Sequence, residues 1–163
     1  MNNYSALQKL LHQASLSKHF VREISFDIER ALFLKKCNIE DEGQHVFVTG
    51  LARSGTTILL NSLYDTQNFA SLTYEDMPFI LCPNLWSKIN FSKTHQDPSE
   101  RAHGDGILVS TNSPEAFEEV FWLTFEKEEN WDELFQNYVS LILLKYNKNR
   151  YLSKNNQNIR RLE

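Results

Sequence analysis

The residues whose types and spacing are best suited to chemistry follow a short apolar run, Val46-Phe47-Val48. The next nine, Thr49 to Thr57, read T-G-L-A-R-S-G-T-T, so two glycines bound a turn and two threonines open a helix. Glycines let the backbone curl until several N–H groups at a helix start converge on one anion. The spacing is close to the nucleotide-binding pattern G-x-x-x-x-G-K-[ST], but Thr56 occupies the lysine position and the cation is Arg53. The loop therefore predicts an anion site, but one that is poorly suited to a triphosphate because the lysine is missing.

The types of the loop residues suggest which anion fits. The guanidinium of Arg53 can grip two oxygens at once. Further N–H and hydroxyl donors come from Ser54, Gly55, Thr56 and Thr57. We expect these five residues to bind an anion with a bulky tetrahedral end, whereas the competing interpretation is an ordinary surface arginine in a turn.

Three segments resemble one enzyme family. Residues 49–60 resemble the 5′-phosphosulfate loop of sulfotransferases that use 3′-phosphoadenosine 5′-phosphosulfate (PAPS), usually written P-[RK]-S-G-T-[ST], with Ala52 where proline is common. Residues 71–78 are similar to the segment that carries the base in the bacterial and protein-tyrosine sulfotransferase-like branch. Residues 151–156 are similar to a later strand of that branch, whose lysine faces cofactor and acceptor. The likeness spans about residues 45 to 163.

The resemblance implies a reaction and a set of roles. A sulfuryl group would pass from PAPS to an acceptor hydroxyl by in-line attack, without a metal. Arg53 and the loop N–H groups would stabilise the phosphosulfate, and Glu75 would be the general base. We expect a small-molecule or carbohydrate-type acceptor, but sugar, lipid headgroup, small metabolite and peptide tyrosine all stay open.

Several residues have two interpretations. Asp76 is an alternative base, although it suits the cap of a helix better. His103 and Asp105 lie in a glycine-containing loop, where an acceptor contact and a solvated loop are equally reasonable. Lys154 is either a cofactor or acceptor contact or a plain surface lysine. The acids after Pro114 are predicted to form a solvated helix face, with an acceptor contact from one of them as the minority interpretation: Glu115, Glu118 and Glu119.

Two other functions remain open from the sequence. One is a kinase-like nucleotide-binding enzyme, which would need a lysine near the loop and an aspartate for Mg²⁺. The other is a truncated, non-catalytic phosphate-binding module that serves in an interaction.

The elements that must position these residues follow from hydrophobic periodicity and turn signals. A strand, a glycine loop and a helix in succession predict an α/β fold, and the resemblance makes it a P-loop NTPase-like three-layer sandwich with a central parallel sheet. We expect strands at residues 45–49 and 151–153, and we expect residues 68–73 to be a connection that leads into a second short strand. We expect helices at residues 18–36, 56–64, 76–89, 131–146, from Ser113-Pro114 and from Asn156.

Bulk properties bound the rest. The chain has 163 residues and a net charge of −4, which disfavours broad nucleic-acid binding. Two cysteines and no apolar run of about 20 residues suggest a cytoplasmic protein without a membrane span. We expect a helical segment over residues 1–44 and an α/β domain over 45–163, which stops inside a helix. This ending predicts a chain truncated at its C-terminus, without the 3′-phosphate-binding residues of PAPS enzymes. The oligomeric state is open.

Overall fold

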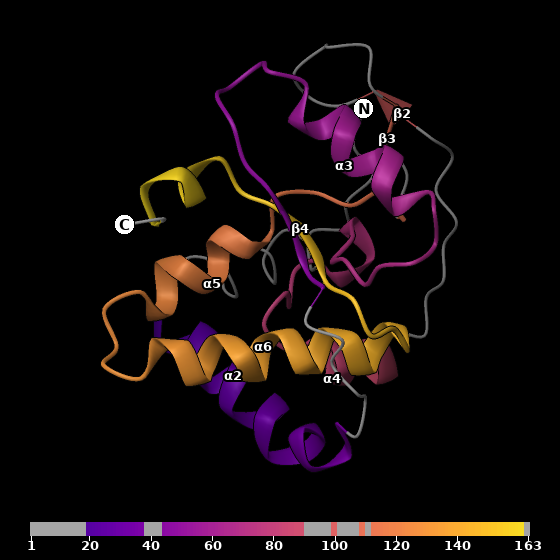
Figure 1. The fold of residues 1–163 in the computed structure, drawn as a ribbon. Helices are drawn as coiled ribbons and strands as arrows, with labels where there is room; N and C mark the ends of the chain where they lie inside the picture. Colours follow the sequence, from indigo (N-terminus) through magenta and orange to yellow (C-terminus); the bar gives the residue numbers. More distant parts are fainter. Residues whose placement is uncertain (1–18, 38–43, 90–98, 101–107, 110–111, 162–163) are drawn as a thin grey trace.

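The computed structural model describes residues 19–37, 44–89, 99–100, 108–109 and 112–161. Figure 1 shows a helix-rich chain with a small sheet. The helices and strands are α2 (His19–Phe33), β1 (Val46–Val48), α3 (Thr56–Tyr64), α4 (Pro83–Ile89), β2 (Ser99–Glu100), β3 (Leu108–Val109), α5 (Glu118–Phe125), α6 (Trp131–Tyr146) and β4 (Leu152–Lys154). Short 3₁₀ helices cover Leu34–Lys36, Tyr74–Asp76 and Asn156–Arg161.

The sheet pairs segments that are about a hundred residues apart. β1 and β4 are parallel, with Val46 opposite Leu152 and Val48 opposite Lys154. On the other side of β4, Ala70 forms a parallel bridge to Tyr151. The spatial order is therefore β1, β4 and the segment around Ala70, all running in one direction. Parallel pairing fits the α/β class that the sequence predicts. A separate antiparallel pair joins β2 and β3.

Helices cover both faces of this sheet. Alternate residues of a strand face opposite sides, and Val48 and Leu152 pack with Leu60 of α3. On the opposite side, the ring of Phe47 lies 6.1 Å from that of Phe135 in α6. In Figure 1 the strands cross the middle of the molecule between α3 and α6.

The larger core lies among α2, α4, α5 and α6. Its centre is a group of aromatic rings at separations of 4.9 to 6.5 Å, which suits edge-to-face and offset packing. These rings belong to Phe26, Phe121, Phe125 and Tyr138. Because Phe26 is in α2, the helix before the loop and the helices after it share one core.

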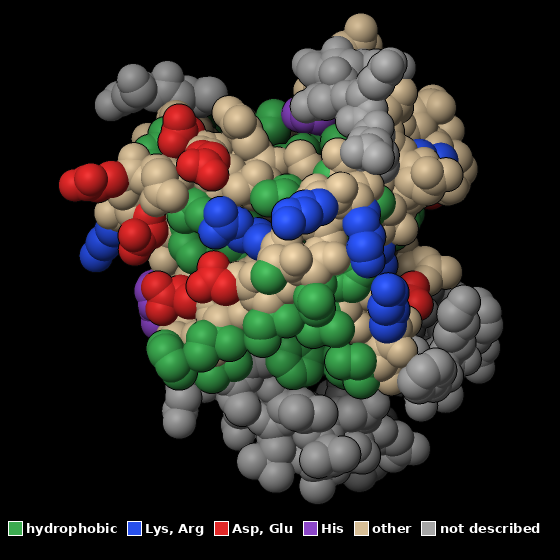
Figure 2. All heavy atoms as spheres, turned by 90° about the horizontal axis from the view of Figure 1, so that it is seen from below, with side chains coloured by type: hydrophobic (Ala, Val, Ile, Leu, Met, Phe, Trp, Pro, Cys, Tyr) green, Lys and Arg blue, Asp and Glu red, His purple; other side chains and the backbone are tan. Residues whose placement is uncertain are grey.

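The outer face of α2 differs from the expectation. The hydrophobic spacing predicts an apolar stripe that packs on the core, with a partner-binding helix as the minority interpretation. Among the large apolar residues of α2, only Phe26 and Phe33 are buried. A second row stays exposed by 40 to 68%: Phe20, Ile24, Ile28 and Leu32. Figure 2 shows a band of hydrophobic side chains on this side of the molecule. Spacing by four residues sets this row on a different side of the helix from Phe26.

The helix after the loop has the predicted bounds but not the predicted orientation. α3 spans Thr56–Tyr64, as expected for residues 56–64. The hydrophobic spacing predicts that Ile58 and Leu59 point inward together with Leu60. In the structure Ile58 and Leu59 are 64% and 51% exposed, while Leu60 is fully buried. A helix so short contacts the sheet along one narrow line, which here runs through Leu60.

Two further helix predictions are wrong, each at a proline. The helix predicted over residues 76–89 begins only at Pro83. Pro78 has no N–H to continue a helix, whereas a proline is tolerated at a first helical position. The helix predicted from Ser113 begins at Glu118. There Pro114 forms an antiparallel bridge with Thr73, which keeps this segment extended.

The other predicted elements lie close to their expected positions. The bounds of α6 equal the predicted residues 131–146, and the predicted helix over 18–36 is α2 with its 3₁₀ extension. The strand predicted at 151–153 is β4, one residue later. Residues 68–73, expected to lead into a short strand, form isolated bridges at Ala70 and Thr73, and the helix predicted from Asn156 is the 3₁₀ helix Asn156–Arg161.

Candidate functional site

The parallel pairing brings three predicted site segments to one edge of the sheet. The glycine loop follows β1, Lys154 is the last residue of β4, and Glu75 follows the segment that bridges at Ala70. The carboxyl ends of parallel strands lie at the same edge, which is where open α/β sheets bind their ligands. We call this region the carboxyl edge.

The glycine loop is tight for two separate reasons. A Cβ on Gly50 would lie 2.9 Å from the Ser54 hydroxyl oxygen and 3.1 Å from the Thr56 methyl group, so a larger residue there would require these side chains to shift. Gly55 caps α3 with a φ of +85°, a conformation that favours glycine. Both predicted glycine roles therefore have a structural cause.

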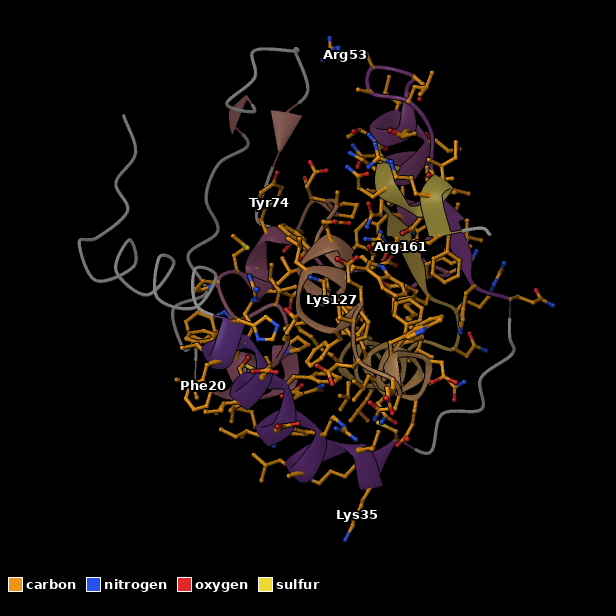
Figure 3. The ribbon with its side chains drawn as sticks, turned by 90° about the vertical axis from the view of Figure 1, so that its left-hand side faces the viewer. Phe20, Lys35, Arg53, Tyr74, Lys127 and Arg161 are labelled. Atoms are coloured by element: carbon orange, nitrogen blue, oxygen red, sulfur yellow. The ribbon has the colours of Figure 1, made fainter. Side chains whose placement is uncertain are left out.

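Arg53 has an unusual backbone conformation. Its φ is +68°, in the left-handed region that side chains other than glycine, asparagine and aspartate rarely adopt. The residue is exposed, and Figure 3 shows it at the outer end of the loop. Backbone strain of this kind is concentrated at functional sites. At the start of the loop, the buried hydroxyl of Thr49 has no hydrogen-bond partner among the described residues.

Lys154 is the buried cation of the carboxyl edge. The residue is 7% exposed, so it is not a plain surface lysine. Its Nζ donates to the hydroxyl oxygen of Thr57 at 2.8 Å and to Oε1 of Glu115 at 2.9 Å. An ammonium therefore lies beside the first turn of α3, next to the loop that lacks its lysine.

Glu115 is held by several donors, which the sequence did not suggest. Its Oε1 also accepts the N–H of Ala116 at 3.0 Å, and its Oε2 accepts the hydroxyl of Tyr74 at 3.4 Å. The side chains of Lys154 and Glu115 are only 9% and 13% exposed. The two residues are 39 positions apart, and nothing in their local sequence pairs them.

The predicted solvated face is wrong for Glu118 as well. This carboxylate is 2% exposed and accepts hydrogen bonds from the indole of Trp122 and the hydroxyl of Tyr151. Glu119 pairs with Arg161 and accepts from Asn155. These acids tie α5 to the end of β4 and to the residues after it.

Glu75 and Asp76 are neighbours with different environments. Asp76 is fully buried and accepts the N–H of Thr73 in a capping box, as well as donors from Tyr146 and Lys145. Glu75 is exposed, and its backbone carbonyl accepts the indole N–H of Trp86 at 3.1 Å. Asp76 therefore has a capping role, although in the 3₁₀ helix Tyr74–Asp76 and not in the helix predicted around Pro78. Glu75 is left as the acid that solvent can reach.

An electrostatic effect on Tyr64 links Glu75 to α3. Burial raises the pKa of Tyr64, and the charges of Asp76 and Glu75 raise that pKa further. Tyr64 is the last residue of α3, so the negative charge of Glu75 acts on the helix that the loop opens.

Other sequence-predicted positions contribute less. His103 and Asp105 lie outside the described residues. His45 has a structural role, because its Nδ1 accepts the N–H of Tyr151 at 3.0 Å. The described ranges contain no group of three metal-binding side chains. A polar hollow of about 400 Å³ lies at the amino ends of the paired segments, opposite the carboxyl edge, lined by Gln67, Asn68, Asn147, Lys148 and Asn149.

Comparison with family models, with curated proteins and with solved structures finds no match to this chain. Within the part that the structure describes, no helix is both long enough and apolar enough to cross a bilayer. The site must therefore be interpreted from its own geometry.

Proposed function

We propose that this chain carries the phosphosulfate-binding part of a PAPS-dependent sulfotransferase site of the P-loop fold, acting in the cytoplasm. The reaction moves a sulfuryl group from PAPS to an acceptor hydroxyl. The observation that carries the proposal is the contact of 2.8 Å between Lys154 Nζ and Thr57 Oγ1. It supplies the glycine loop with a buried ammonium, although the lysine position of that loop holds threonine.

The charges suit a phosphosulfate without a metal. Arg53 in the loop and Lys154 beside it are two cations near a helix start that contributes N–H donors and a partial positive charge. In sulfuryl transfer, negative charge develops on the bridging oxygen of the leaving phosphate, and fixed donors stabilise such charge effectively. The strand order, with β4 between β1 and the Ala70 segment, supports the three-layer sandwich of the P-loop fold.

Glu75 is the proposed general base. It lies after a parallel segment of the same sheet and is exposed, while its neighbour Asp76 is occupied by buried partners. A base in this role deprotonates the acceptor hydroxyl as it attacks sulfur, and it contributes about 10² to 10⁴ in rate.

The test has a binding arm and a transfer arm. The binding arm titrates the chain with adenosine 5′-phosphosulfate, which carries the phosphosulfate without the 3′-phosphate, and separately with Mg-ATP. The transfer arm follows labelled sulfate from PAPS to a panel of sugar, phenol and steroid hydroxyls. We expect adenosine 5′-phosphosulfate to bind and Arg53→Ala to weaken that binding.

The same measurements separate the alternatives. Hydrolysis of Mg-ATP that survives Arg53→Ala would contradict the proposal and favour a kinase-like enzyme. Phosphosulfate binding without transfer to any acceptor would favour a non-catalytic module. Loss of binding in the Arg53 variant together with loss of transfer in Glu75→Gln would support the sulfotransferase.

A further inference from the structure

The Lys154–Glu115 pair at the carboxyl edge has a consequence for the charge of the ligand. Glu115 neutralises the ammonium that lies beside Thr57, at an Nζ–Oε1 distance of 2.9 Å. A cation recruited only to attract an anion would bind more strongly without this partner. The pair therefore fixes the position of the Lys154 ammonium but reduces the positive charge that a ligand meets there.

The carboxylate of Glu115 cannot easily leave when a ligand arrives. The Ala116 N–H and the Tyr74 hydroxyl hold its two oxygens independently of Lys154. A ligand terminus that approaches the Lys154 ammonium therefore meets a fixed negative charge close behind it.

From this arrangement we infer that Glu115 is a specificity-determining residue that selects a terminal sulfate over a terminal phosphate. The inference rests on the proposed function, because it concerns the terminus that the glycine loop would hold. A sulfate ester carries one negative charge, whereas a terminal phosphate carries nearly two at neutral pH. Both termini are tetrahedral, so shape separates them poorly and charge separates them well. The repulsion from Glu115 grows with the charge of the terminus, so it penalises phosphate more than sulfate.

Adenosine 5′-phosphosulfate and ADP are the matched probes, because they differ in the terminal group and its charge. We would measure both affinities by calorimetry in buffer with EDTA, for the unmodified chain, Glu115→Gln and Glu115→Ala. The control is Glu119→Gln, which removes the same charge from a carboxylate that pairs with Arg161 instead of Lys154. The alanine variant keeps the test open if glutamine is poorly accommodated, and circular dichroism verifies folding.

The expected result is a preference for the phosphosulfate in the unmodified chain. That preference shrinks by about tenfold in both Glu115 variants, the effect of one unit charge at about 3 Å when water screens it fully, and it stays unchanged in Glu119→Gln. An unchanged preference in the Glu115 variants, with the phosphosulfate still bound, overturns the inference and leaves the proposed function standing. If the unmodified chain binds neither nucleotide, the proposed function fails and the inference fails with it.

Discussion

The Nζ of Lys154 lies 2.8 Å from the hydroxyl oxygen of Thr57, although 97 residues separate them in the chain. The contact exists because β1 and β4 pair in parallel with Val48 opposite Lys154, which brings the end of β4 to the helix that follows the glycine loop. One register thus assembles the cation, the loop and the helix start.

Removal of Lys154 alone should destabilise the fold more than removal of the whole pair. Lys154→Met leaves the carboxylate of Glu115 nearly buried without its ammonium, which should cost about 2 kcal/mol in the free energy of unfolding. The double variant Lys154→Met/Glu115→Gln should recover at least half of that loss. Urea denaturation measures both, and equal losses in the single and double variants would show that the pair is not coupled.

Replacement of Arg53 should affect binding but not stability. The residue is exposed at the outer end of the loop, so Arg53→Ala should change the free energy of unfolding by less than about 0.5 kcal/mol. The loss of a charge-assisted contact should weaken adenosine 5′-phosphosulfate by about ten- to a hundredfold. Arg53→Lys keeps the charge but not the fork of donors. Its affinity for adenosine 5′-phosphosulfate should therefore lie between those of the unmodified protein and Arg53→Ala. Unchanged affinity in the alanine variant would remove Arg53 from the site.

Glu75→Gln should slow sulfate transfer without destabilising the fold. If Glu75 is the base, sulfate transfer should fall by about 10² to 10⁴, while the affinity for adenosine 5′-phosphosulfate and the melting temperature stay close to those of the unmodified protein. Radiolabelled sulfate transfer measures the rate. Transfer at the original rate in this variant would show that another group accepts the proton.

Asp76→Asn should have the opposite profile. The buried carboxylate of Asp76 accepts from Thr73, Tyr146 and Lys145, and removal of one charge from such a network costs about 3 kcal/mol. The neighbouring Glu75→Gln is the matched control, since it makes the same chemical change one residue earlier. Similar unfolding curves for the two variants would contradict the structural role of Asp76.

Glu29 should contribute a stability that falls as pH rises. Its buried carboxylate accepts the backbone N–H groups of Asn84 and Leu85 at the start of α4. Burial raises the pKa of Glu29 above its ordinary 4.5, although these hydrogen bonds offset part of the shift. The native state therefore holds the proton to a higher pH than the unfolded chain, and the contribution is full below pH 4.5 and declines above it.

The measurement for Glu29 is the stability difference between the unmodified protein and Glu29→Gln across that range. Because glutamine does not titrate, the advantage of the unmodified protein should shrink as pH increases above 4.5. A difference that is constant or grows with pH would mean that burial does not dominate this pKa.

The sequence predicted the elements whose signals are local. The periodicity of residues 131–146 and the glycines around Arg53 require no knowledge of the rest of the chain, and α6 and the loop formed as expected. Long-range contacts decided the failures. Thr73 pairs with Pro114 and prevents a helix from starting there, and the short α3 meets the sheet through Leu60 while Ile58 stays exposed.

In the candidate site, too, local motifs predict some residues and long-range contacts determine the others. The loop residues and the order of Glu75 and Lys154 along the chain can be read from motifs. The partner of Lys154 cannot, because Glu115 reaches it only through the register of β4 and the bridge between Thr73 and Pro114. Acids at a helix start usually face water, and only the fold shows that Glu118 is buried.

The most direct test of the central claim is to map where a phosphosulfate binds. Backbone amide shifts of the labelled chain, recorded by NMR during titration with adenosine 5′-phosphosulfate, identify the residues around the ligand. We predict saturable shifts at Gly50, Arg53, Gly55 and Thr57, with Lys154 among the affected residues. Shifts confined to the polar hollow at the opposite edge, around Gln67 and Asn149, or no saturable shift at all, would contradict the account.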